Sequence, residues 1–383
     1  MDMKSLYHRV EEERESMLDL WKRLVNIDCG SQNKAGITQV SRIIADFLAD
    51  CQIPVHYYHN ERGGDTLVAP WGDMTRPFIV FLGHMDTVFQ DGTVHERPFT
   101  IRDGQAFGPG VLDMKGGIVI ALYTLKILGE TGYSRFPIKL ILTGDEENGH
   151  RYSQAGQWIV EECRHAHAAF NFETGFCDNS VVVERKGCLN ATLTVTGKGA
   201  HAGNNPQEGR SAIREMAHKV LALESLTDFQ SGNTVNVGVI QGGTVPNAVS
   251  EQCEIVVDLR FVDEVSKKAY IQKIQDIAHT VYEEGTTGTV EFSASFDAMA
   301  RLPATMELFS EVNALVQENG FAPLIPKKVG GGSDSAYAVA AGVPTLCAMG
   351  VQGTGNHTVD ERADVASLFT RTKMMLAIMM GLK

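Results

Sequence analysis

The 383-residue sequence lacks the features that define several classes of protein. No apolar run reaches the roughly 18 residues of a membrane-spanning helix, and the N-terminal segment has no apolar core of the signal-peptide kind. We therefore expect a cytoplasmic protein with no membrane partner. Basic residues are also few, with 34 Lys and Arg against 47 Asp and Glu and a net charge of −13. Because phosphate binding needs a basic face, this balance argues against nucleic acid as a partner.

Cysteine pairs and complete nucleotide or serine-hydrolase motifs are missing as well. The seven cysteines are scattered without a C-x-x-C pair, which favours buried, reduced thiols. The segment 144–149 has P-loop spacing, but His150 stands where that motif requires lysine. Asp113 stands where a dinucleotide fingerprint starting at Gly108 requires glycine. The segment 331–335 lacks the second glycine of a nucleophile elbow.

What the sequence does contain is an alternation of helical and strand patterns. Short apolar runs at 78–82, 138–143 and 168–172 are rich in strand formers, and helical patterns separate them. This order indicates an α/β fold with a mostly parallel sheet flanked by helices. The alternation stops near residue 182 and returns after 296. We therefore predict a discontinuous domain made of 1–181 and 297–383.

The intervening segment, 182–296, has a different pattern. Its strands and helices follow the order β-α-β-β-α-β, which is typical of a ferredoxin-like α+β unit. Its length is normal for a small domain. We predict that it forms an inserted second domain.

Acidic and imidazole side chains follow the predicted strands of the first domain. In an open α/β sheet the carboxyl ends of the strands meet at the ligand crevice, so we expect these side chains to lie close together. Any one of them alone is more simply an ordinary surface or core residue. Together, two imidazoles and several carboxylates predict a site for Zn²⁺, with Co²⁺ or Mn²⁺ as alternatives. The candidates are His84, Asp86, Asp113, Glu146, Glu147, Glu173 and His357.

The segments that carry these residues resemble a known superfamily of zinc-dependent hydrolases. It comprises glutamate carboxypeptidases, aminoacylases, acetylornithine deacetylases and succinyl-diaminopimelate desuccinylases. The resemblance runs from about residue 8 to the C-terminus. Residues 97–99 and 197–203 look closest to the glutamate carboxypeptidase branch. The matching segments are 83–88, 108–117, 144–149, 198–206 and 330–338.

The resemblance implies two metal ions that share one carboxylate. His84, Asp113 and Glu173 would hold one ion, and Asp113, Glu147 and His357 would hold the other. The charges agree with this pairing. Three carboxylates leave one positive charge on two divalent ions, which one bound hydroxide would neutralise.

The resemblance also gives roles to two acids outside that ligand set. Glu146 would be the general base that takes a proton from water and passes it to the leaving amine. Asp86 would accept a hydrogen bond from His84, although a turn or cap residue is the simpler alternative. His150 and the pair Thr174-Gly175 depart from the superfamily pattern beside the metal loops, which bears on substrate choice.

The inserted segment carries further matching residues. His201 would reach into the site of a partner chain and steady the oxyanion. Asn247 and Arg260 would contact the substrate, Arg260 by gripping its carboxylate, with Gly330, Gly331 and Gly332 beside it. Without the resemblance, Arg260 reads as part of a solvated strand face and the three glycines as a plain turn.

Taken together, these residues predict a two-zinc metallohydrolase that acts as a homodimer through the inserted domain. It would cleave an amide bond next to a free carboxylate and release a C-terminal, glutamate-type amino acid. An N-acyl-amino-acid amidohydrolase or a dipeptidase is the alternative with the same machinery. A metal-dependent binding protein without catalysis is the alternative from another class, and the intact Glu146 argues against it.

Overall fold

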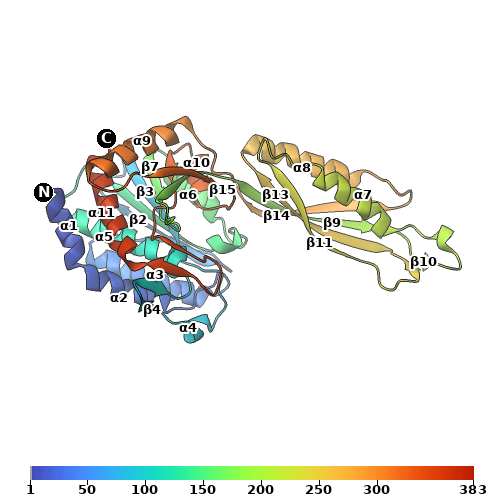
Figure 1. Ribbon diagram of the computed structural model, residues 1–383, viewed down its shortest axis with the longest axis horizontal. Coiled ribbons are helices and arrows are strands. Elements are labelled where there is room, and N and C mark those ends of the chain that lie inside the picture. The colour runs from blue at the N-terminus through green and yellow to red at the C-terminus, as the bar shows by residue number, and fades with distance from the viewer. Residues whose placement is uncertain (1) are drawn as a thin grey trace. The chain divides into compact units, whose positions relative to one another are not determined.

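The computed structural model describes residues 2–383, apart from the side chains of residues 294 and 295, and it contains two compact units (Figure 1). The first unit comprises residues up to Glu184, Arg301–Lys328 and Ser333–Lys383. The second comprises Arg185–Ala300 and Val329–Gly332. The predicted insertion, 182–296, therefore starts and ends slightly early and does not include Val329–Gly332.

A six-stranded sheet with the order β1-β2-β6-β3-β7-β16 forms the centre of the first unit. β3 pairs in parallel with β6 and β7, and β16 pairs in parallel with β7. The predicted α/β fold is thus confirmed, but the sheet is mixed, because β1 and β2 run antiparallel to their neighbours. The strands are β1 (His56–Tyr58), β2 (Gly64–Trp71), β3 (Phe78–His84), β6 (Ile138–Gly144), β7 (Ala166–Asn171) and β16 (Thr345–Leu346).

Helices surround this sheet, and both ends of the chain lie in the first unit (Figure 1). α5 follows the Asp113 segment and is buried along nearly its whole length, as its apolar sequence requires. The helices are α1 (Met3–Glu12), α2 (Arg14–Val25), α3 (Lys34–Asp50), α4 (Thr93–Glu96), α5 (Gly116–Glu130), α6 (Ala155–Cys163), α9 (Pro303–Glu318), α10 (Ser335–Ala340) and α11 (Val365–Gly381). Two further sheets are small. One contains β4 (Thr100–Arg102), β5 (Gln105–Phe107), β17 (Gly353–Thr354) and β18 (Arg362–Asp364). The other pairs β8 (Ser180–Arg185) with β15 (Ile325–Val329).

The second unit has the predicted order of strands and helices. Its four-stranded antiparallel sheet is ordered β11-β13-β9-β14. Along β13, side chains alternate so that Ile255, Val257 and Leu259 are buried. The elements are β9 (Gly187–Thr196), β10 (Ala200–His201), α7 (Ala212–Glu224), β11 (Thr234–Gly242), β12 (Ala248–Val249), β13 (Gln252–Phe261), α8 (Glu264–His279) and β14 (Thr287–Phe296).

Not every cysteine is buried as predicted, since Cys51 and Cys188 are half-buried. Cys177 is exposed, so the expectation of buried thiols is wrong at that position. Cys29, Cys163 and Cys253 are buried, as expected of small apolar side chains. Within residues 2–383, no helix has the length and apolarity that crossing a membrane demands.

Arg371 on α11 is an unusual member of the core, and it carries a stability prediction. The side chain is 2% exposed, and its Nη1 and Nη2 atoms have no hydrogen-bond partner among the described residues. Burial accordingly lowers the pKa of Arg371 to about 10. Arg371→Met keeps the length and removes the buried charge, so we expect the free energy of unfolding to rise by about 1–3 kcal/mol.

Urea denaturation measures this change. Arg42→Met, at an exposed position of α3, is the matched control and should leave the free energy of unfolding unchanged. A loss of stability in Arg371→Met would show that the guanidinium stabilises the fold, contrary to this expectation.

Candidate metal centre and active site

Two groups of metal-ligand side chains lie in the first unit and share Asp113. One group is His84, Asp113 and Glu173, and the other is Asp113, Glu147 and His357. Within each group the candidate ligand atoms all lie within 4.8 Å of one another. The same residues are the ligands that the sequence resemblance implies.

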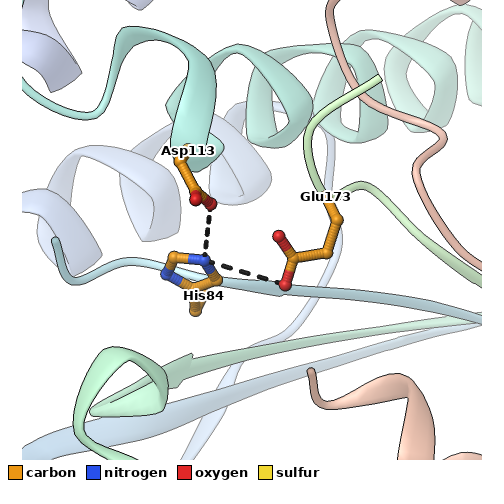
Figure 2. A group of neighbouring side chains, drawn as sticks. All are labelled: His84, Asp113 and Glu173. Atoms are coloured by element: carbon orange, nitrogen blue, oxygen red, sulfur yellow. Dashed lines mark hydrogen bonds and ion pairs between the residues drawn. The ribbon is translucent and has the colours of Figure 1, made fainter. Parts of the chain in front are cut away.

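Figure 2 shows the first group. His84 Nε2 lies 3.2 Å from Asp113 Oδ1 and 3.9 Å from Glu173 Oε1. In the second group, His357 Nε2 lies 3.3 Å from Asp113 Oδ2 and 3.2 Å from Glu147 Oε2. Asp113 therefore turns one oxygen toward each group.

The elements that deliver these residues explain why they meet. His84 is the last residue of β3, and Glu173 follows β7 by two residues. Glu147 lies in the short 3-10 turn Glu146–Asn148, after β6. Since β3, β6 and β7 are parallel neighbours, their carboxyl ends meet at one edge. Asp113 comes from the turn before α5 and His357 from the loop between β17 and β18.

Burial and charge strongly perturb the protonation of this group. His84 is 1% exposed, and burial lowers its pKa, but the Glu146 charge and hydrogen bonds to Asp113 and Asp86 outweigh burial and raise the pKa well above the usual range. Hydrogen bonds to Asp113 and Glu147 raise the pKa of His357 to about 10. Burial raises the pKa of Glu147 to about 6 and that of Glu146 well above its usual range. The carboxylates of this site lie close together, so a positive charge among them is stabilised.

The donor set fits divalent cations. Carboxylate and imidazole donors in these proportions suit Zn²⁺, Co²⁺ or Mn²⁺. In addition, the buried Glu147 Oε1 has no hydrogen-bond partner among the described residues, as expected of an oxygen that a cation would take. Glu146 Oε2 lies 4.0 Å from His84 Nε2, yet Glu146 belongs to neither ligand group.

Asp86 contacts more than the imidazole. His84 Nδ1 lies 3.1 Å from the Asp86 backbone carbonyl oxygen and 3.4 Å from Asp86 Oδ1. The Asp86 carboxylate also accepts hydrogen bonds from the backbone N–H groups of Glu146 and Glu147, both at 3.1 Å, and from Ser31 Oγ at 2.6 Å. Asp86 therefore orients the Glu146–Glu147 turn and His84 together.

Sequence reasoning missed Glu361. This residue is 1% exposed, and its carboxylate accepts hydrogen bonds from the backbone N–H groups of Gly110, Leu112 and Asp113 at 2.8–3.0 Å. Burial raises its pKa to about 7, against the effect of those hydrogen bonds. Glu361 holds the turn that carries Asp113. An acid in a polar loop gives no sequence signal for such a role, and only its place four residues after His357 hints at it.

The remaining predicted residues lie at two separate places in the second unit. His201, on β10, and Asn247 are exposed, and the Ala202 N–H donates to the Asn247 carbonyl oxygen. His201 Nδ1 accepts from the N–H groups of Gly203 and Asn204, both at 3.1 Å, so Nε2 carries the ring proton.

The other place is the far end of β13. Arg260 is half-buried, its Nε donates to both carboxylate oxygens of Asp258, and its Nη1 donates to the Gly330 carbonyl oxygen at 3.4 Å. Gly331 and Gly332 follow directly, and their carbonyl oxygens accept from Arg185. Arg260 and Gly330–Gly332 are thus together, apart from His201 and Asn247.

Comparisons with known proteins find a matching family model and relatives of similar length. The model of Peptidase family M20/M25/M40 matches residues 80–381. The chain belongs to this family. The predicted superfamily resemblance and the prediction of a metal-dependent peptidase or amidohydrolase are thereby confirmed.

Relatives in this family cover nearly the whole chain. Carboxypeptidase G2 from Pseudomonas sp. strain RS-16 is 26% identical over 98% of this chain and 92% of its own. Succinyl-diaminopimelate desuccinylase from Beijerinckia indica is 26% identical over 96% of this chain and 99% of its own. The aminopeptidase PepT structure from Bacillus cereus has a TM-score of 0.80 at 22% identity and covers 96% of this chain and 98% of its own, which shows the fold.

Proposed function

We propose that this M20/M25/M40 family member is a two-zinc amidohydrolase that cleaves an amide bond next to a free carboxylate and releases a C-terminal, glutamate-type amino acid. The observation that carries the proposal is the position of the Asp113 carboxylate, whose two oxygens face two different ligand groups. The similarity to carboxypeptidase G2 supports the carboxypeptidase assignment. The similarity to desuccinylases and deacetylases keeps an N-acyl-amino-acid hydrolase or dipeptidase as the second candidate.

Each residue then has a defined task. Metal ions held by the two ligand groups would supply Lewis-acid chemistry, which would lower the pKa of a water molecule and polarise the scissile carbonyl. Glu146, buried and outside both ligand groups, takes the proton of the attacking water and delivers it to the leaving nitrogen. Arg260 and the amides of Gly330–Gly332 hold the carboxylate of the substrate. His201 Nε2–H and Asn247 contact the carbonyl end.

We propose that His201 and Asn247 come from the second chain of a homodimer. Arg260 lies eight residues along β13 from Gln252, which places it about 27 Å from the end where β12 leads into β13. One small substrate cannot span that distance, so the two groups would meet it from different chains. β11 supports such pairing, because it is a sheet edge that exposes Val239 and Ile240.

Mixing two inactive variants tests the shared site. A dimer of one Glu146→Gln chain and one His201→Ala chain has one complete site if His201 acts in the partner's site. Random exchange of subunits should then restore about one quarter of wild-type activity. If the mixture stays inactive while the chains exchange, His201 acts within its own chain.

A cavity of about 770 Å³ beside Glu147 indicates which acyl group the enzyme takes. Its described lining includes the polar residues Gln32, Asn33, Gln90 and Asn148, and it includes Asp91 but no Lys or Arg. Such a cavity suits a neutral acyl or peptidyl group that forms hydrogen bonds. A succinyl carboxylate would face Asp91 and be repelled.

A substrate panel with added Zn²⁺ tests the function and this preference. We expect kcat/KM for N-benzoyl- and N-acetyl-glutamate to exceed that for N-succinyl-glutamate by about tenfold or more. Dipeptides and other N-acetyl amino acids test the second candidate. If the metal-loaded protein hydrolyses none of these compounds, the proposed function is refuted. A preference for the succinyl compound would refute the assignment of the cavity.

A further inference from the structure

A buried network of charged side chains lies beside the Glu146–Glu147 turn and belongs to neither ligand group. His150 is 7% exposed, Asp145 0% and Asp334 1%. His150 Nδ1 lies 3.0 Å from Asp145 Oδ1, and Nε2 lies 2.6 Å from Asp334 Oδ1. His150 is also a residue at which the sequence departs from its superfamily pattern.

The surrounding contacts define the charge state of the network. Asp145 Oδ1 also accepts from Ser153 Oγ at 2.9 Å, and Asp334 Oδ2 accepts from Thr143 Oγ at 2.7 Å. Both carboxylates are therefore acceptors, and both ring nitrogens of His150 must donate. The ring is an imidazolium between two carboxylates, which makes both hydrogen bonds charge-assisted. Burial opposes this state, but the Asp334 charge and the hydrogen bonds outweigh it and raise the pKa of His150 to about 10.

The backbone here needs such support. Gly149 and His150 have φ values of 71° and 54°, both in the left-handed region. That conformation suits glycine but is unfavourable for a residue with a Cβ. It turns the chain back, so that the His150 N–H donates to the Asp145 carbonyl oxygen at 3.1 Å. The ring, held at both nitrogens, keeps this turn closed.

The network joins three segments of the first unit. Thr143 is in β6, Asp145 immediately precedes the Glu146–Glu147 turn, and Asp334 immediately precedes α10. Asp86 holds the same turn through the N–H groups of Glu146 and Glu147. The turn is therefore fixed at its backbone by Asp86 and at the residue before it by His150.

We propose that His150 is a positioning residue that holds Glu146 in place for proton transfer by clamping Asp145 to Asp334. The proposal rests on the proposed function, because Glu146 matters only if it is the general base. Glu147 Oε2 lies 3.2 Å from His357 Nε2, whereas the carboxylate of Glu146 has only the longer, 4.0 Å contact to His84 Nε2 among the described residues, so its position depends mainly on the turn. A displacement of about 1 Å at such a residue costs rate without abolishing substrate or metal binding.

His150→Gln breaks the clamp with little change in size. The glutamine amide can donate to one carboxylate, but its carbonyl oxygen then faces the other. We expect kcat to fall about 10–100-fold, with KM within about threefold and bound metal unchanged. In the double variant His150→Gln with Asp334→Asn, the asparagine amide donates to the glutamine carbonyl and should recover most of the loss.

His165→Gln is the matched control, because His165 is an exposed histidine that is also left-handed, with a φ of 68°. It should leave kcat unchanged. Three outcomes would each overturn the clamp. The first is a wild-type kcat in His150→Gln, and the second is a loss of kcat that tracks the amount of bound metal or folded protein. The third is a double variant that recovers no activity.

A spectrum of ¹⁵N-histidine-labelled protein separates this proposal from the proposed function. Two ring N–H signals that disappear in His150→Gln at pH 7 support the imidazolium clamp without any assay, and their absence in wild type overturns it. If the signals are present but wild type and Glu146→Gln are equally inactive on the whole panel, the proposed function fails, and with it the catalytic role of the clamp.

Discussion

Glu146→Gln is expected to lower kcat by about 10³-fold while the protein still binds two metal ions per chain. Glutamine keeps the size and the hydrogen-bonding capacity of the side chain but cannot accept and release a proton. Because Glu146 belongs to neither ligand group, the ions should stay bound. The KM should change little, since no contact to the proposed carboxylate site is lost.

Steady-state kinetics with metal analysis of the same samples measures both quantities. Glu161→Gln, an exposed position on α6, is the matched control and should behave as wild type. Retention of more than about one tenth of wild-type kcat would exclude Glu146 as the general base. Loss of metal together with activity would instead make Glu146 a ligand.

The metal ligands were the most predictable part of the site. His84, Glu147 and Glu173 follow parallel strands, and strand patterns in the sequence are enough to bring them to one edge. Asp113 and His357 come from irregular segments, whose conformation no periodicity specifies. Their assignment needed the superfamily resemblance, and the structure then places both within reach of the others.

The supporting residues could not be predicted in the same way. Glu361 accepts hydrogen bonds from backbone N–H groups, and Asp334 contacts the buried His150. In both cases the partner lies far away in the sequence. Such contacts depend on tertiary packing, and each residue looks like an ordinary polar loop residue in the sequence. The antiparallel strands β1 and β2 were missed for a related reason, because their segment contains Pro70 and Gly64 and lacks a clean strand pattern.

The second unit shows where patterns predict elements but not their ends. Its β-α-β-β-α-β order follows from alternation and helical periodicity. The exact start of its first helix, at Ala212, does not follow from that periodicity. Ser211 caps it by accepting from the Arg214 N–H, and Pro206–Glu208 form a separate 3-10 turn. Caps of this kind decide the end of a helix within a few residues of where periodicity places it.

Asp113→Asn is expected to have the largest effect on metal binding, because this one change removes a charged ligand from both groups. Bound metal should fall from about two ions per chain toward zero, and kcat/KM should fall by about 10³-fold or more. Glu173→Gln and Glu147→Gln each alter one group, so each should lose about one ion. Metal content after dialysis against a weak chelator measures the difference.

The contrast between shared and unshared ligands is the decisive comparison. Asp103→Asn, at an exposed turn, should keep both ions and serves as the control. If Asp113→Asn loses no more metal than Glu173→Gln, Asp113 does not bridge, and the two-metal proposal fails even if the protein is active. If Asp113→Asn loses both ions and each single-group variant loses one, each oxygen of Asp113 serves one ligand group. This result would agree with the 3.2 Å contact to His84 and the 3.3 Å contact to His357.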